Sequence, residues 1–189
     1  MSPSPLIAAL RAAFAAHADA KNAGPMQAYM KSAMPFYGVP SPRMRAVARE
    51  VDARHPLATF EEWRETLLTL WREATHREER YVVLELAGRP RYRPYRTREA
   101  LPLYEELVVS GAWWDLVDDL SGNLLARLLE RHPAETKPLL RRWAAGADLW
   151  LRRAAMLCQR SLDAAQVDAV LLYDTILPSI GKGQFADEF

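Results

Sequence analysis

The stretch from Trp113 to Asp118 holds residue types that could do chemistry on a positively charged group. It contains two indoles and two carboxylates, which belong to Trp113, Trp114, Asp115 and Asp118. On a helix, Trp114 and Asp118 are four residues apart, so their side chains lie on one face. An indole plane beside a carboxylate can hold and stabilise a cation. This stretch is therefore the first candidate for a functional site.

The same residues also have structural interpretations. Neighbouring residues on a helix point about 100° apart, so one of the two indoles faces the core whatever the other does. Asp118 could be an exposed helix acid, or the partner of Arg127 or Arg131. Spacing alone leaves these interpretations open beside the chemical one.

The charge of the chain gives little indication of its partners. The 189 residues are half hydrophobic, which is enough for one domain with a substantial core. Lys+Arg 25 against Asp+Glu 24 gives a net charge of +1, which by itself does not indicate nucleic-acid binding. Nearly all of the positive charge is arginine, which suits bidentate phosphate contacts. Genome composition can produce the same preference for arginine.

Residues that bind metals or form disulfides are sparse. Cys158 is the single cysteine, and the histidines are scattered without ligand spacing, at His17, His55, His76 and His132. No apolar run reaches the roughly 18 residues that a membrane span needs. We therefore expect no metal and no membrane partner, and a cytoplasmic location.

The elements that must position the candidate site are helices. Apolar residues recur at helical spacing, and no run alternates as a strand does. Ser41 before Pro42 is typical of a helix N-cap, and Thr59 with Glu62 is typical of a capping box. The expected helices, joined by short Pro/Gly turns, cover residues 7–15, 26–34, 41–51, 60–71, 76–86, 99–110, 113–131, 134–145, 149–162 and 164–180.

Residues 89–98 form a Pro-interrupted connector that is the most basic part of the chain. Its arginines alternate with Tyr92 and Tyr95, a composition found in nucleic-acid-binding segments. The connector also lies between two expected helices, where it could be a turn at the rim of the molecule. Both interpretations stay open.

One internal similarity favours a stack of helical pairs. Gly111-Ala112 recurs as Gly146-Ala147, 35 residues later. Helical-pair repeats have periods of about 35 to 45 residues, and equivalent positions of adjacent repeats line one concave surface. The same offset carries Asp118 onto Arg153, so these two side chains are expected side by side.

The chain resembles the AlkD-like DNA glycosylases, which are HEAT-like repeat proteins that excise N3- and N7-alkylated purines. The resemblance runs from the first helix to the last residue, and its most specific parts are a Trp–Asp cluster and a later Trp–Arg helix. The segments that carry it are Pro25-Met26, Tyr29-Met30-Lys31, Gly38 with Pro42 and Arg45, Leu103-Tyr104-Glu105-Glu106-Leu107, Trp113-Trp114-Asp115 with Val117-Asp118, and Trp150-Leu151 with Arg153-Ala154-Ala155.

The resemblance implies roles for individual residues. Asp118 matches the catalytic carboxylate, Trp114 matches the tryptophan that packs against the deoxyribose, and Arg153 matches the arginine that holds the DNA backbone at the lesion. The implied partner is duplex DNA with cationic alkylpurines, and neither a base-binding pocket nor a cofactor is implied. Further DNA contacts are expected at Trp113, Tyr29, Lys31 and Arg152.

The resemblance also implies a fold and a setting. We expect an all-α, superhelical stack of HEAT-like antiparallel helical pairs (an α-solenoid), forming one domain over residues 1–189 of a monomer. The protein would be bacterial in type and associated with the nucleoid when bound to DNA. In the relatives, a segment like 184–189 runs on into a helix with another tryptophan, so we expect the domain to lack a carboxy-terminal part. The alternative is a non-catalytic HEAT-like module that binds DNA or a protein partner through its concave face.

Overall fold

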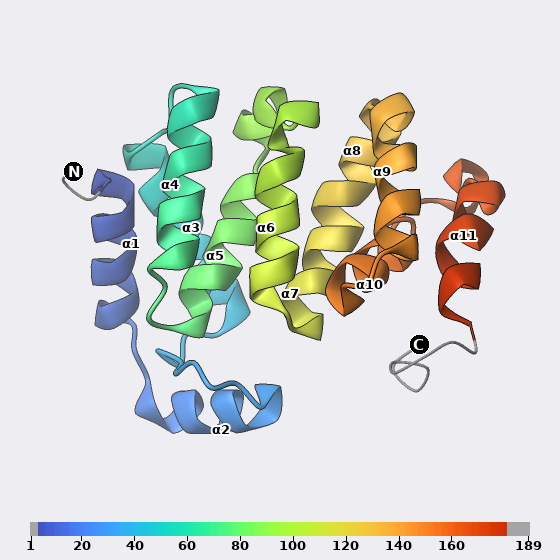
Figure 1. The fold of residues 1–189 in the computed structure, drawn as a ribbon. Helices are drawn as coiled ribbons and strands as arrows, with labels where there is room; N and C mark the ends of the chain where they lie inside the picture. Colours follow the sequence, from blue (N-terminus) through green and yellow to red (C-terminus); the bar gives the residue numbers. More distant parts are fainter. Residues whose placement is uncertain (1–3, 181–189) are drawn as a thin grey trace. The chain divides into compact units, whose positions relative to one another are not determined.

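Every regular element that the structure describes is a helix (Figure 1). The computed structural model describes residues 4–180, and the chain groups into two compact units, one up to Tyr95 and one from Arg96. The predicted all-α class is confirmed. The prediction of one domain over residues 1–189 stays a prediction, and the segment 184–189 lies outside the described residues.

In the first unit, α3 packs on both α1 and α5, and α4 packs on α5. Buried side chains recur one turn apart, as Leu6, Leu10 and Phe14 do on the first helix, because one face of each helix must leave water. The elements of this unit are α1 (Pro5–Ala16), α2 (Ala20–Met30), α3 (Ser41–Arg54), α4 (Phe60–Arg72), α5 (Arg77–Gly88) and the 3-10 segment η1 (Pro90–Tyr95).

Two predicted helix starts are corrected in part. Ser41 is the first helical residue of α3 rather than its cap, and Pro40 is the N-cap. Thr59 caps α4 as predicted, since its hydroxyl accepts the N–H of Glu62 at 3.1 Å. The Glu62 carboxylate accepts the N–H of Ala58 at 2.8 Å, one residue before the position that a capping box requires.

The second helix, α2, buries none of its residues. It begins at Ala20 rather than near Met26, because the Asp19 carboxylate accepts the N–H of Lys21 at 2.9 Å and caps the helix start. Pro25 lies inside the helix. The C-cap residue of α2, Lys31, has a left-handed backbone conformation with φ 48°.

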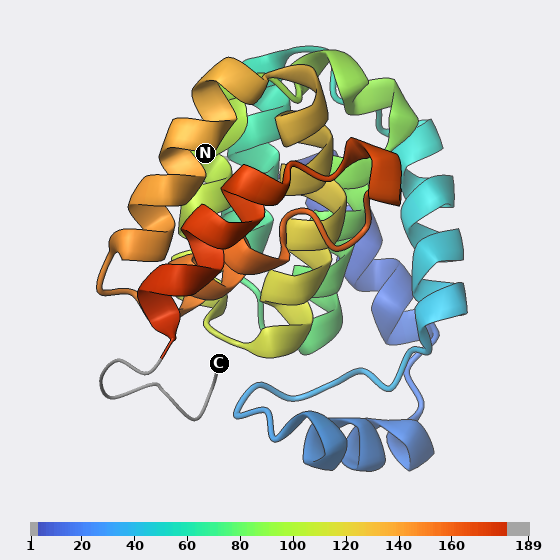
Figure 2. The same ribbon diagram turned by 90° about the vertical axis from the view of Figure 1, so that its right-hand side faces the viewer.

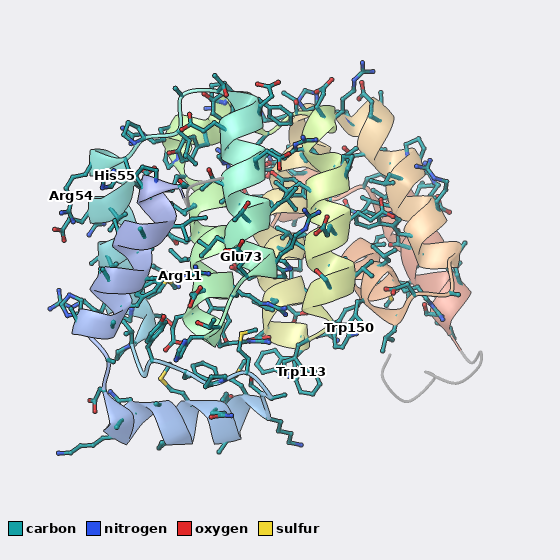
Figure 3. All side chains as sticks on the ribbon, turned by 60° about the vertical axis from the view of Figure 1, so that its left-hand side comes forward. Arg11, Arg54, His55, Glu73, Trp113 and Trp150 are labelled. Atoms are coloured by element: carbon teal, nitrogen blue, oxygen red, sulfur yellow. The ribbon has the colours of Figure 1, made fainter. Side chains whose placement is uncertain are left out.

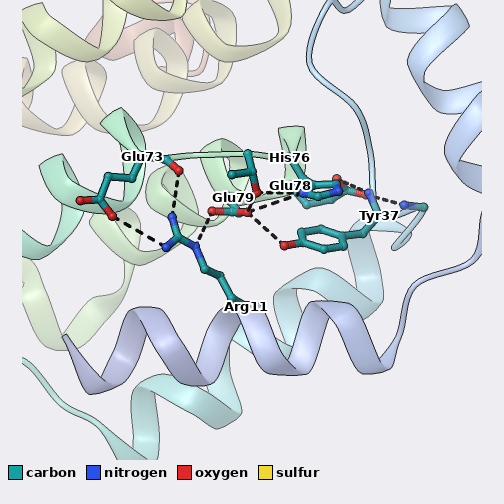
Figure 4. Close-up of polar contacts among 8 residues, drawn as sticks. Arg11, Tyr37, Glu73, His76, Glu78 and Glu79 are labelled. Carbon is teal, nitrogen blue, oxygen red and sulfur yellow. Dashed lines mark hydrogen bonds and ion pairs between the residues drawn. The ribbon is translucent and has the colours of Figure 1, made fainter. Parts of the chain in front are cut away.

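Two buried carboxylates of α5 hold the segment that follows α2 (Figure 4). The Glu78 carboxylate accepts three consecutive backbone N–H groups of residues 37–39, at 2.9 to 3.1 Å. The Glu79 carboxylate accepts Nε of Arg11 at 3.0 Å and the hydroxyl of Tyr37 at 3.1 Å. These contacts fold the turn against α5, and they give the cluster a structural role.

The basic connector 89–98 is folded into short 3-10 segments, η1 and η2 (Arg98–Ala100). The fully buried Asp52 of α3 accepts Nε of Arg89 at 2.6 Å, Nη1 of Arg91 at 3.4 Å, and the hydroxyl of Tyr92. Buried charges need such partners, so these two arginines serve the packing of η1 on α3. A DNA contact by other residues of the connector stays a prediction.

The second unit is centred on α10, which packs on α9, α7 and α6, while α11 lies beside α9 (Figure 2). Its elements are η2, α6 (Leu101–Gly111), α7 (Trp114–Asp119), the π-helical segment η3 (Leu120–Leu125), α8 (Ala126–Arg131), α9 (Pro133–Ala145), α10 (Leu149–Leu157), η4 (Ala164–Gln166), α11 (Ala169–Ile176) and η5 (Leu177–Ser179).

Three helices predicted in this unit are interrupted. The helix over residues 113–131 changes from α7 to the π-helical η3 and back to α8, and the N–H of Ala126 donates to the carbonyl of Ser121, five residues earlier. The helix predicted over 149–162 ends at Leu157 and continues as tight turns. The helix predicted over 164–180 is α11 flanked by η4 and η5. Apolar periodicity does not distinguish these variants of helical backbone.

Candidate functional site

Asp118 and Arg153 lie side by side in the second unit. The last turn of α7 presents Asp118, the middle of α10 presents Arg153, and the two helices pack on each other. Nε of Arg153 donates to Oδ1 of Asp118 at 2.7 Å, and Nη2 donates to Oδ2 at 2.8 Å. This is the bidentate geometry of a guanidinium on a carboxylate. The proximity predicted from the 35-residue offset is confirmed, and the partner of Asp118 is neither Arg127 nor Arg131.

The ion pair is partly open to solvent, with the Asp118 side chain 17% exposed and the Arg153 side chain 29% exposed. The hydrogen bond to Asp118 raises the pKa of Arg153 above its usual value, so this guanidinium remains a cation. Because both side chains reach solvent, an anion that approaches from solvent can meet the Arg153 guanidinium.

The two indoles of the site face different surroundings. Trp114, one turn before Asp118, is 42% exposed. Trp113 is the N-cap of α7, and its ring packs against that of Trp150, with centroids 6.3 Å apart and planes tilted by 42° (Figure 3). The expectation that one of the two indoles faces the core is wrong, because Trp114 is exposed and Trp113, on the extended N-cap of α7, is only partly covered.

The remaining predicted DNA contacts are Arg152 in the second unit and Tyr29 and Lys31 in the first. Arg152 donates through Nε and Nη2 to the hydroxyl of Ser179 in η5, at 3.2 and 2.9 Å. Tyr29, 77% exposed, and Lys31, also exposed, belong to the first unit at the end of α2. Their contacts with DNA stay predictions.

One residue beside Asp118 was not identified from the sequence. Nη2 of Arg160 donates to the main-chain carbonyl of Asp118 at 2.9 Å. The only sequence signal for it is its position seven residues after Arg153, which is two helical turns. That signal is weak in a chain with so many arginines.

The described residues offer no cluster of metal ligands. Within residues 4–180, no three His, Cys, Asp or Glu side chains gather as metal ligands would. No helix in the same range is long and apolar enough to cross a membrane. An open hollow of about 260 Å³ lies elsewhere in the second unit, and its lining includes Leu129, Lys137, Gln159 and Asp168.

The arrangement combines three chemical capacities on one accessible surface. Arg153 can bind a phosphate through the same fork that now holds Asp118. The Asp118 carboxylate can offer negative charge to a cationic centre, and the exposed face of Trp114 can pack against it.

Comparisons with known proteins identify the family and the fold. The sequence profile of a family described as "DNA alkylation repair enzyme" matches residues 10–184. A solved structure described as a predicted DNA alkylation repair enzyme from Enterococcus faecalis shares the fold, with a TM-score of 0.78 and 23% sequence identity over 89% of this chain and 77% of that one. No curated protein matches the sequence. Because the family profile covers nearly the whole chain, the protein belongs to the DNA alkylation repair enzyme family.

Proposed function

We propose that this protein is a DNA glycosylase that hydrolyses the N-glycosidic bond of cationic N3- or N7-alkylated purines in duplex DNA. The observation that carries the proposal is the solvent-accessible Asp118 carboxylate, one turn from an exposed indole and held by a guanidinium that can exchange partners. Membership of the repair family supplies the class of substrate.

The chemistry of the lesion suits a site with a single carboxylate. Alkylation at N3 or N7 gives the purine a positive charge, so the base leaves as a neutral molecule when the C1′–N9 bond breaks. The bonding electrons go to the base, and the positive charge passes to the deoxyribose as an oxocarbenium ion. Water then adds to C1′ and loses a proton, which leaves an abasic site. The general acid of ordinary glycosidases is not needed for such a leaving group.

Asp118 would act on the deoxyribose. Its carboxylate either stabilises the oxocarbenium charge electrostatically or positions the water that attacks C1′. Trp114 would pack its ring against the sugar, add cation–π attraction and exclude water. Such a contact contributes about 0.5 to 2 kcal/mol.

Arg153 would hold the phosphate at the lesion. A phosphate contact fixes the position of the strand without reading its sequence. Because the Arg153–Asp118 pair is partly solvated, a phosphate can reach the guanidinium and replace the carboxylate as its partner. The exchange also leaves the Asp118 carboxylate available to the sugar.

A direct test measures release of free base from a duplex that carries one N7-methylguanine. We expect the 189-residue chain to release N7-methylguanine faster than the spontaneous rate, and to release no base from the same duplex with unmodified guanine. Release at the spontaneous rate, with the chain bound to the duplex, would contradict the proposal.

One observation favours the alternative of a non-catalytic binding module. Both carboxylate oxygens of Asp118 are engaged by Arg153, as they would be in an ion pair that simply joins α7 to α10. The module predicts binding of modified duplex with no base release. It also predicts no effect of Asp118→Asn beyond a small change in stability, and measurement of binding and release with the same samples separates the two functions.

A further inference from the structure

We infer that Arg160 is a positioning residue for Asp118. Arg160 acts through the main chain of Asp118, and Gly122 and the π-helical segment η3 shape the place where the two residues meet. This inference rests on the proposed function, because it assigns a role within the same reaction. It concerns the contact between Nη2 of Arg160 and the carbonyl of Asp118, at 2.9 Å.

The helical backbone beside Asp118 is unusual. Regular α-helix stops at Asp119, and η3 occupies the next six residues. A π turn inserts extra backbone into a helix, and such turns occur frequently at functional sites. The hydroxyl of Ser121 also donates to the carbonyl of Val117, at 2.5 Å. Two successive carbonyls just before η3, those of Val117 and Asp118, therefore accept hydrogen bonds from side chains.

Gly122 leaves room for the Arg160 side chain to cross η3. A Cβ atom at position 122 would lie 2.8 Å from Nε of Arg160 and 2.6 Å from the hydroxyl oxygen of Ser161. Both distances are shorter than real Cβ atoms show, so any other residue at 122 would displace these side chains. A side chain at 122 would therefore push Nε of Arg160 out of the position from which Nη2 meets the Asp118 carbonyl.

Two arginines hold different parts of Asp118. Arg153 binds the carboxylate, while Arg160, on the turns that continue α10, binds the carbonyl. On a helix the side chain tilts toward the N-terminus and the carbonyl points toward the C-terminus. When Arg153 moves to a phosphate, the contact from Arg160 remains and keeps the Asp118 main chain in place.

Because Arg160 is exposed, its contact with Asp118 should matter more for the reaction than for the stability of the fold. The hydrogen bond lies at the surface, where such contacts contribute little to folding. Displacement of a catalytic group by about 1 Å, by contrast, can slow a reaction as much as 100-fold. Loss of Arg160 should therefore affect the reaction rate more than the stability.

The test compares Arg160→Ala and Gly122→Ala with the unsubstituted chain on a duplex that carries one N7-methylguanine. Arg160→Ala removes the guanidinium, and Gly122→Ala keeps it but fills the space it crosses. We expect each to lower the single-turnover rate at saturating protein about tenfold, with unchanged DNA affinity. The thermal midpoint should be unchanged in Arg160→Ala, whereas it shifts in Gly122→Ala because the added Cβ displaces neighbouring side chains. Arg160→Lys should recover part of the rate. Arg127→Ala, which removes an exposed arginine from α8, is the matched control.

The possible outcomes are distinct. If Arg160→Ala weakens DNA binding and lowers its salt dependence while the saturated rate is unchanged, Arg160 contacts a phosphate and the inference is wrong. Unchanged rate and affinity in both variants also overturn it, while the proposed function stands. If the unsubstituted chain releases no base, the proposed function fails, and the inference fails with it. Addition of Asp118→Asn should abolish the effect of Arg160→Ala, because the two residues act as one unit.

Discussion

At the residue scale, the contact between Asp118 and Arg153 connects DNA binding to chemistry. The Arg153 fork holds both carboxylate oxygens in the absence of DNA. Under the proposed function, a phosphate that takes Arg153 away removes two donors from Asp118 at the moment when the sugar arrives. The negative charge is then least neutralised where the oxocarbenium ion forms, and a preorganised charge of this kind is an effective form of catalysis.

Trp114→Ala should slow base release without unfolding the protein. The ring is 42% exposed, so its removal costs little core packing. Loss of a cation–π contact of about 0.5 to 2 kcal/mol corresponds to a rate roughly 2- to 30-fold lower. Single-turnover release from an N7-methylguanine duplex measures this effect, with Trp114→Phe as the variant that keeps an aromatic ring. An unchanged rate in Trp114→Ala would show that the indole does not face the sugar.

At the element scale, the sequence predicts the type of element better than its continuity. Helical periodicity locates α3, α4 and α9 because each buries one face along its whole length. It misses η3 and the end of α10 at Leu157, because a π turn or a tight turn keeps nearly the same apolar spacing. These interruptions depend on packing between helices, such as the passage of Arg160 over Gly122, which no local pattern encodes.

The site shows the same division between predictable and unpredictable features. The pairing of Asp118 with Arg153 follows from equivalent positions in successive helical pairs, so an offset in the sequence is enough to find it. Arg152 lies next to Arg153 but points about 100° away around the helix, and it meets Ser179. That contact depends on where η5 folds back on α10, which cannot be inferred from the sequence around Arg152.

We expect the protein to lose folding stability at high pH, because Tyr92 is buried where η1 packs on α3. Burial, together with the hydrogen bond to Asp52, raises the pKa of Tyr92 to about 12, against about 10 in an unfolded chain. The contribution of Tyr92 is therefore complete below pH 10 and is lost progressively as the pH rises toward 12, because only the unfolded chain ionises readily there. Urea unfolding of the unsubstituted chain and of Tyr92→Phe between pH 8 and 12 measures the difference.

In this experiment, the difference in unfolding free energy between the two proteins should shrink as the pH rises above 10. Other tyrosines contribute equally to both proteins and cancel in the comparison. A difference that is constant over the whole range would show that Tyr92 does not titrate differently in the folded and unfolded states.

At the scale of the whole molecule, most of the positive charge is balanced within the structure. Lys+Arg 25 stands against Asp+Glu 24, and carboxylates pair with Arg11, Arg89, Arg141 and Arg153, among others. Each phosphate contact displaces counterions from DNA, so the slope of log affinity against log salt concentration measures the number of phosphate contacts. We therefore expect the affinity for DNA to depend only weakly on salt concentration, because few arginines contact phosphates.

Arg153→Ala should reduce the slope of log affinity against log salt concentration by about 1, because one phosphate contact is lost. Arg141→Ala is the matched control, since it removes an arginine that is paired with Asp174 at 2.7 Å on another helix of the same unit. Titration of a fluorescent duplex at several salt concentrations gives both slopes. Equal slopes in the two variants would show that Arg153 does not contact a DNA phosphate.

The central claim is that the Asp118 carboxylate drives base release. The most direct test is the single-turnover release of N7-methylguanine from a duplex by the unsubstituted chain, by Asp118→Asn, and by Asp119→Asn as the neighbouring control. We predict that Asp118→Asn lowers the rate about 100-fold or more, with little change in stability, and that Asp119→Asn has no effect. Equal rates for Asp118→Asn and the unsubstituted chain would contradict the account.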